Sequence, residues 1–227
     1  MEKEEKNIIE KNIRLILFTI TFWIFILIVH NIFKNDIYKF DDLVYKYISK
    51  PINPTLTKIF SVFTNVGSGF VMIPLCIIAF AVLKEKIEPI FISINFALAA
   101  LINYILKNIF ERQRPADYRL IHASGYSFPS GHSMVSMAFY GFIIYLIFKN
   151  VKNVKIKWLT SIALSILIIL IGISRIYLGV HYASDVFGGF LLSIVYLTLY
   201  TKLYKTVYDK HQENKKAKIA EGIIEDR

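Results

Sequence analysis

Six long stretches of this chain contain no Asp, Glu, Lys or Arg, and they constrain its fold more than any other feature. They cover 15–33, 59–83, 89–106, 120–148, 158–174 and 186–201, and they are 19, 25, 18, 29, 17 and 16 residues long. A helix that crosses the hydrocarbon of a bilayer needs about 20 mostly apolar residues, within a range of about 17–25. Five of the stretches are close to that length, and the 29-residue stretch has to be divided.

The longest stretch divides at a polar turn. Its first part, 120–132, contains Pro129 together with glycines, histidines and serines, whereas 133–148 is almost entirely apolar. We therefore expect 133–148 to be the span, and flanking Lys and Tyr side chains to extend the shorter spans into the interface. The prediction is an all-α polytopic membrane protein with six transmembrane helices. The first span could instead be a cleaved signal sequence, but no small-residue cleavage pattern follows it.

Composition supports a membrane protein over a soluble globule. Hydrophobic residues make up 55% of the chain and charged residues 19%, and the mean hydropathy is +0.49. We expect a cytoplasmic lead-in over 1–14, a membrane domain over 15–204 and a polar cytoplasmic tail over 205–227. The single cysteine, Cys76, lies within the second span, where it is predicted to serve packing.

The distribution of basic residues predicts the orientation of the spans. Of the 27 Lys and Arg residues, 17 lie in the two tails and in the loops that contain Lys84 and Lys149, all of which six spans place on one side of the membrane. The positive-inside rule then puts both termini in the cytoplasm, in a multi-pass protein of the plasma membrane. The net charge of +10 is interpreted as topology and contact with anionic lipid headgroups, and nucleic acid is not an expected partner.

Two further patterns predict local structure on the outer side of the first two spans. Apolar residues recur at helical spacing between the spans, which predicts a short amphipathic helix on the membrane surface, as surface packing or as a lid or lipid entry wall. These residues are Ile37, Phe40, Leu43, Val44, Tyr47 and Ile48. Small residues over 64–69 are predicted to allow a close helix approach or a kink in the second span.

The first stretch with candidate functional residues lies at the end of the third span. Lys107 and Arg114 are seven residues apart, so on a helix they would share a face, and Pro115 turns the chain. The positive-inside rule predicts few cations on this side, so they have another use. Contact with lipid headgroups is the alternative, and Glu111 could pair with either cation.

A second stretch precedes the fourth span, where Pro129, Ser130, Gly131 and His132 form a polar turn. A hydroxyl, a glycine and an imidazole at the start of a helix can hold an anion through side chains and backbone N–H groups. The alternative is a simple helix cap, in which Ser130 satisfies the first N–H groups and Gly131 eases the turn.

A third stretch connects the fifth and sixth spans. His181 and Asp185 are spaced i, i+4, so the carboxylate can reach one imidazole nitrogen and leave the other exposed to a substrate. An activated histidine nucleophile needs this arrangement, although a structural histidine paired with Asp185 fits equally well. Arg175 lies near membrane depth, where ionisable groups are expensive and usually functional.

The three stretches fall at the outer ends of spans three to six, so we expect them to converge. Three cations, Lys107, Arg114 and Arg175, with helix-terminal N–H groups suit a phosphoryl group whose charge is spread over its oxygens in the transition state.

With these motifs the chain resembles the type 2 phosphatidic acid phosphatase family, the membrane relatives of the vanadium haloperoxidases. The three-part signature is present in order and without departure, and the resemblance covers about 60–200. It comprises Lys107 with six residues before Arg114-Pro115, then Pro129-Ser130-Gly131-His132, then Ser174-Arg175 with five residues before His181 and three more before Asp185.

The resemblance implies a role for each residue and the core helix bundle of that family. His181 would attack phosphorus to give a phosphohistidine, Asp185 would orient it, and His132 would protonate the leaving oxygen and then activate water. The phosphate oxygens would be bound by Lys107, Arg114, Arg175, Ser130 and Gly131. No metal and no other cofactor is implied.

The expected activity is hydrolysis of a lipid phosphate or diphosphate at the extracytoplasmic face, as in bacterial phosphatidylglycerophosphate and undecaprenyl diphosphate phosphatases. Membrane lipids and the lipid phosphate are the expected partners. Two alternatives stay open at this point: a protein that binds or transports lipid phosphates without hydrolysis, and a haloperoxidase that uses vanadate.

Overall fold

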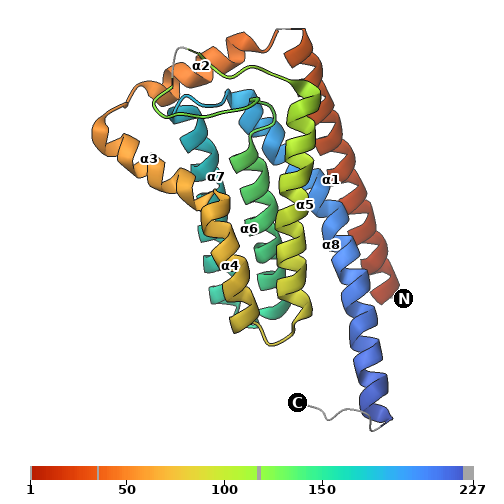
Figure 1. Ribbon diagram of the computed structural model, residues 1–227. Coiled ribbons are helices and arrows are strands. Elements are labelled where there is room, and N and C mark those ends of the chain that lie inside the picture. The colour runs from red at the N-terminus through yellow and green to blue at the C-terminus, as the bar shows by residue number, and fades with distance from the viewer. Residues whose placement is uncertain (1, 35, 117–118, 222–227) are drawn as a thin grey trace.

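The computed structural model describes residues 2–34, 36–116 and 119–221, and within these ranges it contains eight α-helices and no strand. The all-α prediction is therefore confirmed. In chain order the helices are α1 (Glu2–Phe33), α2 (Tyr38–Ser49), α3 (Pro54–Val66), α4 (Gly69–Val82), α5 (Ile87–Phe110), α6 (Gly131–Asn150), α7 (Val154–Tyr177) and α8 (Ala183–Ala220) (Figure 1).

Five single helices, α1, α5, α6, α7 and α8, are long and apolar enough to cross a membrane, and the pair α3 and α4 supplies a sixth, broken span. The two helices of this pair meet at an angle of 46°. The break falls at Gly67 and Ser68, inside the run of small residues where a kink or a close approach was predicted. Both occur, because a Cβ on Gly67 would lie 2.5 Å from Ile171 Cγ2 of α7.

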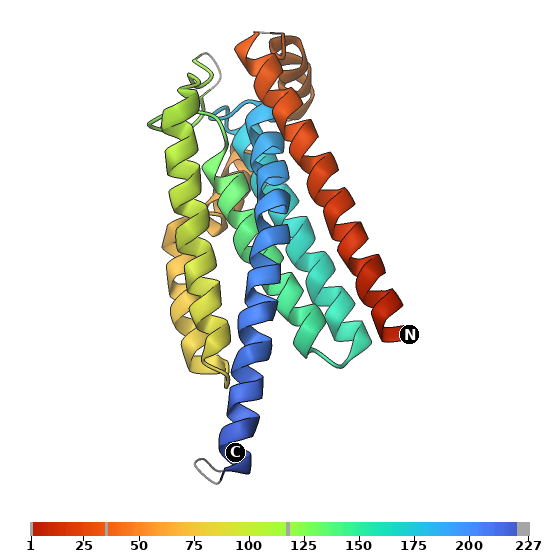
Figure 2. The ribbon, with the colours of Figure 1, turned by 90° about the vertical axis from the view of Figure 1, so that its right-hand side faces the viewer.

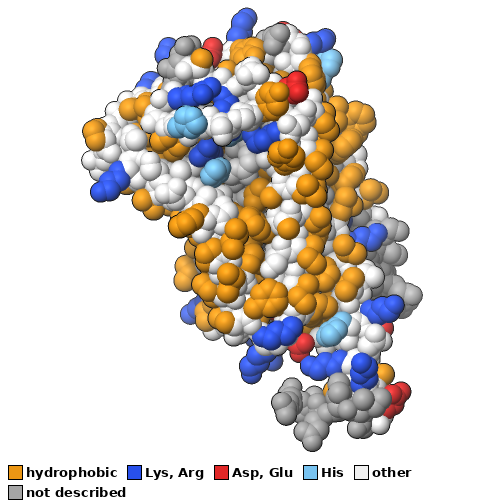
Figure 3. All heavy atoms as spheres, viewed as in Figure 1, with side chains coloured by type: hydrophobic (Ala, Val, Ile, Leu, Met, Phe, Trp, Pro, Cys, Tyr) orange, Lys and Arg blue, Asp and Glu red, His pale blue; other side chains and the backbone are white. Residues whose placement is uncertain are grey.

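Large apolar side chains cover the middle of the molecule, as expected for a surface in contact with lipid tails. Phe70 is 88% exposed and Leu159 is 71% exposed. In Figure 3 the hydrophobic side chains form a broad band over the lower part of α3, over α4 and over α5, and the Lys and Arg side chains gather above and below it. This distribution matches a bilayer-spanning bundle.

Helix α6 forms the centre of the bundle, in contact with α5, α7 and α8. Aromatic side chains dominate the core beside it, where Phe142 packs edge-on against Tyr200 and Tyr204. Cys76 is buried in the same core as a free thiol, which confirms its predicted packing role.

Helix α2 lies across one end of the bundle and contacts α7 and α8 (Figure 1). Its side chains Val44, Tyr45 and Ile48 pack against the apolar cluster that Ile176 forms with Ala183 and Val186. The predicted amphipathic helix is thus present, and its apolar face covers the end of the bundle at which the three sequence motifs lie.

The first and last helices continue beyond the predicted spans. Helix α1 includes the described part of the 1–14 lead-in, and α8 continues past residue 204 to Ala220. In Figure 2 the C-terminal part of α8 extends below the other helices. Residue 1 of the predicted lead-in and residues 222–227 of the predicted tail lie outside the described residues.

Candidate active site

The three motifs meet at one end of the bundle, below α2, where α5, α7 and the starts of α6 and α8 converge (Figure 1). The second and third motifs are joined through backbone groups, because Ser130 N–H donates to the Asp185 carbonyl at 3.0 Å. The first and second motifs touch where a Cβ on Gly131 would lie 3.8 Å from Lys107 Cε. The predicted convergence is observed.

His181 lies at the centre of this arrangement and is only 2% exposed. Its Nδ1 is 3.4 Å from Asp185 Oδ2 and 3.3 Å from Ser127 Oγ, and its Nε2 is 3.0 Å from Arg114 Nη1. A guanidinium can only donate hydrogen bonds, so Nε2 has to accept. The proton of the neutral ring is thereby assigned to Nδ1, on the side of Asp185, and the lone pair of Nε2 points toward Arg114.

The surroundings of His181 keep its imidazole neutral. Burial lowers the pKa of His181 well below its ordinary value of 6.5, and the positive charges of Arg175, Arg114 and Lys107 lower this pKa further. A neutral imidazole keeps the Nε2 lone pair that a nucleophile requires. The i, i+4 pair thus has the geometry predicted from its spacing.

Asp185 is fully buried at the N-terminus of α8, where helix dipole and carboxylate attract each other. Its Oδ2 accepts hydrogen bonds from Ser127 Oγ at 2.5 Å and from Tyr182 N–H at 2.9 Å. Its Oδ1 pairs with Arg112 Nη1 at 2.6 Å. Both oxygens are therefore held by donors from outside the imidazole.

The three predicted cations come from different elements and surround the same point. Arg114 lies in the loop after α5, where it donates to the carbonyls of Ser124 and Gly125 at 2.9 Å each. Lys107 Nζ donates to the carbonyls of Tyr126 and Ser127.

Arg175, near the end of α7, is 5% exposed and donates from Nη1 to Thr64 Oγ1 of α3. Its Nε has no hydrogen-bond partner among the residues that the structure describes. A buried guanidinium with a free N–H is suited to an anionic ligand, since unsatisfied buried donors are costly.

Arg114 does not lie on the helix that carries Lys107. Lys107 and Arg114 were expected to share a helix face, but α5 ends at Phe110 and Glu111 adopts a left-handed conformation with φ 47°. Arg114 reaches the site from the extended segment that follows. The carboxylate of Glu111 interacts with Tyr126.

Ser130, Gly131 and His132 form the first turn of α6 as predicted. Ser130 is the N-cap, fully buried, and its Oγ accepts a hydrogen bond from Ser133 Oγ at 2.9 Å. The cap interpretation of Ser130 is therefore right for its side chain. The first N–H groups of a helix have no partner within it, and those of α6 lie beside Lys107, so they can still receive an anion. Electrostatic interactions link His132 with Arg175, Arg114 and Lys107.

Several polar residues of the site were not singled out from the sequence. Arg112 is 6% exposed and pairs with Asp41 of α2 as well as with Asp185. Ser184 and Ser127 complete the contacts around these carboxylates, and Asn103 Nδ2 of α5 donates to the Pro129 carbonyl at 3.1 Å. Asp41 carried a detectable signal, because it lies three residues before Val44 and seven before Ile48, on the apolar face of its helix.

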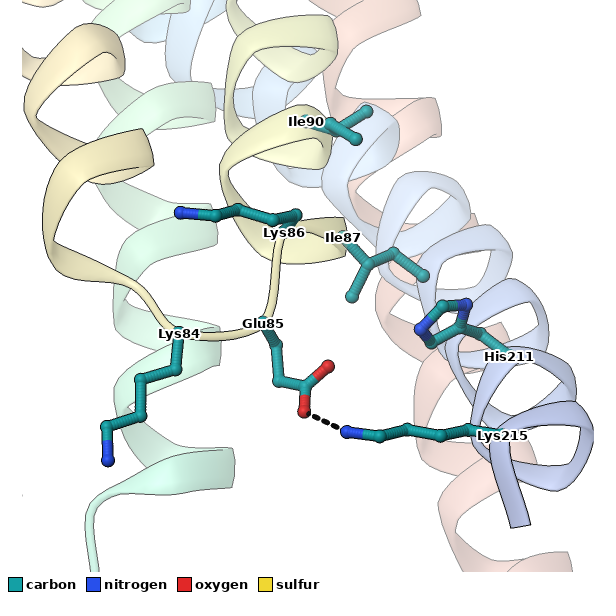
Figure 4. Close-up of a pocket in the computed structure, with 7 residues that line it drawn as sticks. All are labelled: Lys84, Glu85, Lys86, Ile87, Ile90, His211 and Lys215. Carbon is teal, nitrogen blue, oxygen red and sulfur yellow. Dashed lines mark hydrogen bonds and ion pairs between the residues drawn. The ribbon is translucent and has the colours of Figure 1, made fainter. Parts of the chain in front are cut away.

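A hollow of about 710 Å³ lies at the opposite end of the bundle, between the α4–α5 loop and α8 (Figure 4). Its lining residues are Lys84, Glu85, Lys86, Ile87, Ile90, His211 and Lys215. It contains no residue of the three motifs, and Lys215 is paired with Glu85 at 2.9 Å. The candidate active site is therefore the buried cluster of motif residues around His181.

Metal ligands are not grouped in the part of the chain that the structure describes: no three His, Cys, Asp or Glu side chains lie close enough together to hold an ion. The positive charge at the site comes from the guanidinium and ammonium groups of Arg114, Arg175 and Lys107.

Comparison with known proteins identifies relatives of the whole membrane bundle. The sequence model of the PAP2 superfamily matches residues 90–209, which contain all three motifs. Phosphatidylglycerophosphatase B of Bacillus subtilis is 32% identical over 178 residues, which are 77% of this chain and 88% of that protein. An undecaprenyl-diphosphatase of Sulfolobus acidocaldarius is 26% identical over 155 residues, 66% of this chain and 71% of that protein.

The fold is also similar to a solved structure. The crystal structure of a transmembrane PAP2-type phosphatidylglycerolphosphate phosphatase from Bacillus subtilis superimposes with a TM-score of 0.75 at 31% identity. The match covers 85% of this chain and 96% of the other.

Proposed function

Since the chain belongs to the PAP2 superfamily and is a membrane phosphatase, we propose that it hydrolyses a lipid phosphate or diphosphate. The proposed intermediate is a phosphohistidine at His181. The observation that carries the proposal is the state of the His181 ring. One nitrogen faces Asp185 and Ser127, and the lone pair of the other points into a cluster of cations. A neutral nucleophile beside charges that bind its electrophile is the arrangement phosphoryl transfer requires.

In the first step, Nε2 of His181 attacks phosphorus, an N–P bond forms and the bond from phosphorus to the leaving oxygen breaks. The Nδ1 proton stays on the ring, and Asp185 stabilises the positive charge that develops there. In the substrate complex the negative phosphate offsets the neighbouring cations, so His132 carries a proton there, and it gives this proton to the leaving oxygen. In the second step, neutral His132 takes a proton from water, the water oxygen attacks phosphorus, and the N–P bond breaks to release inorganic phosphate.

The phosphate oxygens would be bound by Lys107, Arg114 and Arg175, with the N–H groups of the first α6 turn. Arg175 contributes the free Nε–H described above. Three cations compensate the charge of the transferring group, so the chemistry has a source of electrostatic stabilisation within the chain.

The proposed substrates are undecaprenyl diphosphate or phosphatidylglycerophosphate. This choice is supported by the names of the relatives, a phosphatidylglycerophosphatase and an undecaprenyl-diphosphatase, and by the position of the site at the end of membrane-crossing helices. We place the site at the extracytoplasmic face of the plasma membrane and both termini in the cytoplasm, on the distribution of Lys and Arg.

Phosphate release in detergent tests the proposal directly. We would compare undecaprenyl diphosphate, phosphatidylglycerophosphate and phosphatidic acid as substrates for the unmutated protein, for His181→Ala and for His122→Ala. His122 is a matched control, because it is an exposed histidine of the same outer loop. We expect release by the unmutated protein and by His122→Ala, and none by His181→Ala although it inserts and folds.

Trapping the intermediate tests the mechanism. A brief incubation with substrate labelled in the transferred phosphate should leave acid-labile label on the unmutated protein and none on His181→Ala. Phosphate release without any labelled protein under rapid quench would contradict the phosphohistidine step. Lipid binding by a protein that releases no phosphate would instead support binding without hydrolysis.

A further inference from the structure

Asp41 is the one acidic side chain of α2 that the bundle buries, since it is 2% exposed whereas its neighbour Asp42 is exposed. A buried carboxylate is costly unless donors surround it. Asp41 has such donors: its Oδ1 accepts from Ser184 N–H at 2.8 Å, and its Oδ2 accepts from Ser184 Oγ and from Arg112 Nη2 at 2.7 Å each. All of them belong to the site end of the molecule.

Arg112 connects this carboxylate to Asp185. Its Nη2 contacts Asp41 Oδ2 at 2.7 Å and its Nη1 contacts Asp185 Oδ1 at 2.6 Å, so one planar fork joins two carboxylates. The guanidinium also lies over the Tyr182 ring, 4.2 Å from its centroid. Held on both sides, the fork has a fixed orientation.

The orientation of Asp185 depends on that fork. Oδ1 is directed to Arg112, and this leaves Oδ2 for Ser127, Tyr182 N–H and the Nδ1 of His181. Rotation of the carboxylate would break the contact that assigns the proton of His181 to Nδ1.

We propose that Asp41 is a positioning residue for the proposed phosphatase reaction, acting through Arg112 on Asp185 and thereby on His181. Asp41 lies on α2, outside the 90–209 segment that matches the family. Among the residues that the structure describes, it makes no hydrogen bond or ion pair with His181 or with the cations of the phosphate site. Its contribution to the rate therefore depends on Asp185.

The inference rests on the proposed function, and the test uses the same phosphate-release assay with Asp41→Asn and the matched control Asp42→Asn. We expect Asp41→Asn to lower kcat about 10- to 100-fold, as loss of an outer partner of a functional group does, while KM changes little. Asp42→Asn is expected to behave like the unmutated protein.

A purely structural role of Asp41 would lower the amount of folded protein and the melting temperature, but it would not lower kcat per folded molecule. The double variant with Asp185→Asn distinguishes an effect of Asp41 through Asp185 from an independent effect. If Asp41 acts through Asp185, then adding Asp41→Asn to Asp185→Asn should cause no further loss of rate, whereas independent effects would multiply.

Arg112→Lys carries the test if Asp41→Asn does not fold. A lysine keeps the positive charge, but its single ammonium cannot reproduce the fork that joins both carboxylates. The same loss of kcat at nearly constant KM is expected.

Three results would overturn the inference. The first is an Asp41→Asn kcat within about twofold of the unmutated value. The second is that Asp41→Asn lowers kcat by the same factor in the unmutated protein and in Asp185→Asn, and the third is an Arg112→Lys kcat equal to that of the unmutated protein. Absence of phosphate release by the unmutated protein would overturn the proposed function itself, so the two failures are distinguishable.

Discussion

Replacing Gly189 with alanine is expected to reduce catalysis by moving α6 relative to α8. A Cβ at this position would lie 3.0 Å from the Ser130 carbonyl oxygen, 3.2 Å from Met134 N and 3.3 Å from Ser133 Cβ. All three atoms belong to the first turn of α6 and its cap. Two of them are backbone atoms, which cannot rotate away, so the turn itself has to move by a few tenths of an ångström.

The size of the effect follows from these contacts. Overpacking costs about 1–3 kcal/mol, and the better helix propensity of alanine recovers about 1 kcal/mol, which leaves a net loss of about 0–2 kcal/mol in stability. A misplacement of 1 Å can lower a rate about 10²-fold, and the share of that for a few tenths of an ångström is roughly 3- to 6-fold in kcat.

The assay is phosphate release per folded molecule, with thermal unfolding in the same detergent measured alongside. Gly69→Ala is the matched control, because a Cβ there would meet only Phe96 Cζ, at an ordinary contact distance of 3.6 Å. Its kcat should equal that of the unmutated protein. A Gly189→Ala variant with an unchanged kcat and an unchanged or higher melting temperature would refute the argument that this contact sets the geometry of the two motifs.

Two further predictions concern pH and metal. Because burial and then the cations lower the pKa of His181 well below 6.5, its nucleophile stays neutral as the pH falls through 6.5, and kcat/KM should not decrease there. Arg114→Gln should move the acid limb of kcat/KM to higher pH, and an identical limb in both proteins would contradict this origin. Over the same window the unfolded chain binds a proton that the folded chain does not, so the His181 contribution to stability should decrease with falling pH. EDTA should leave phosphate release unchanged and vanadate should inhibit it competitively, whereas a strict Mg²⁺ requirement or bromide oxidation with added vanadate would count against the histidine mechanism.

Hydropathy and motif spacing were sufficient to predict most of the architecture. Charge-free stretches identified the spans because backbone groups in hydrocarbon have to be satisfied within a helix. The run of small residues over 64–69 identified the break in the second span, and the apolar period of 37–48 identified α2. The angle of α3 against α4 was not predictable, since it depends on the packing of Gly67 against Ile171.

The residues of the three motifs and their convergence were predictable from the sequence. The polar side chains that hold Asp185 in place were not. His181, Asp185 and the three cations meet as their positions at the ends of the helices implied. The network behind Asp185 was missed because Asp41 and Arg112 are 71 residues apart. The place of Asp41 on the apolar face of its helix indicates burial but not its partner, and Arg112 forms no pattern by itself. The end of α5 at Phe110 was missed because the turn before Pro115 begins earlier than the proline alone requires.

In the proposed reaction, the 3.0 Å contact between Arg114 and His181 affects which electrophiles can reach the nucleophile. The guanidinium donates to the same lone pair that would attack phosphorus, so it shields the nucleophile from other electrophiles. A phosphate that offers stronger acceptors can draw Arg114 toward its oxygens, and the same movement uncovers Nε2. An uncharged lipid headgroup offers no such exchange, so it leaves His181 covered. Recognition of the anion and exposure of the nucleophile are then a single event.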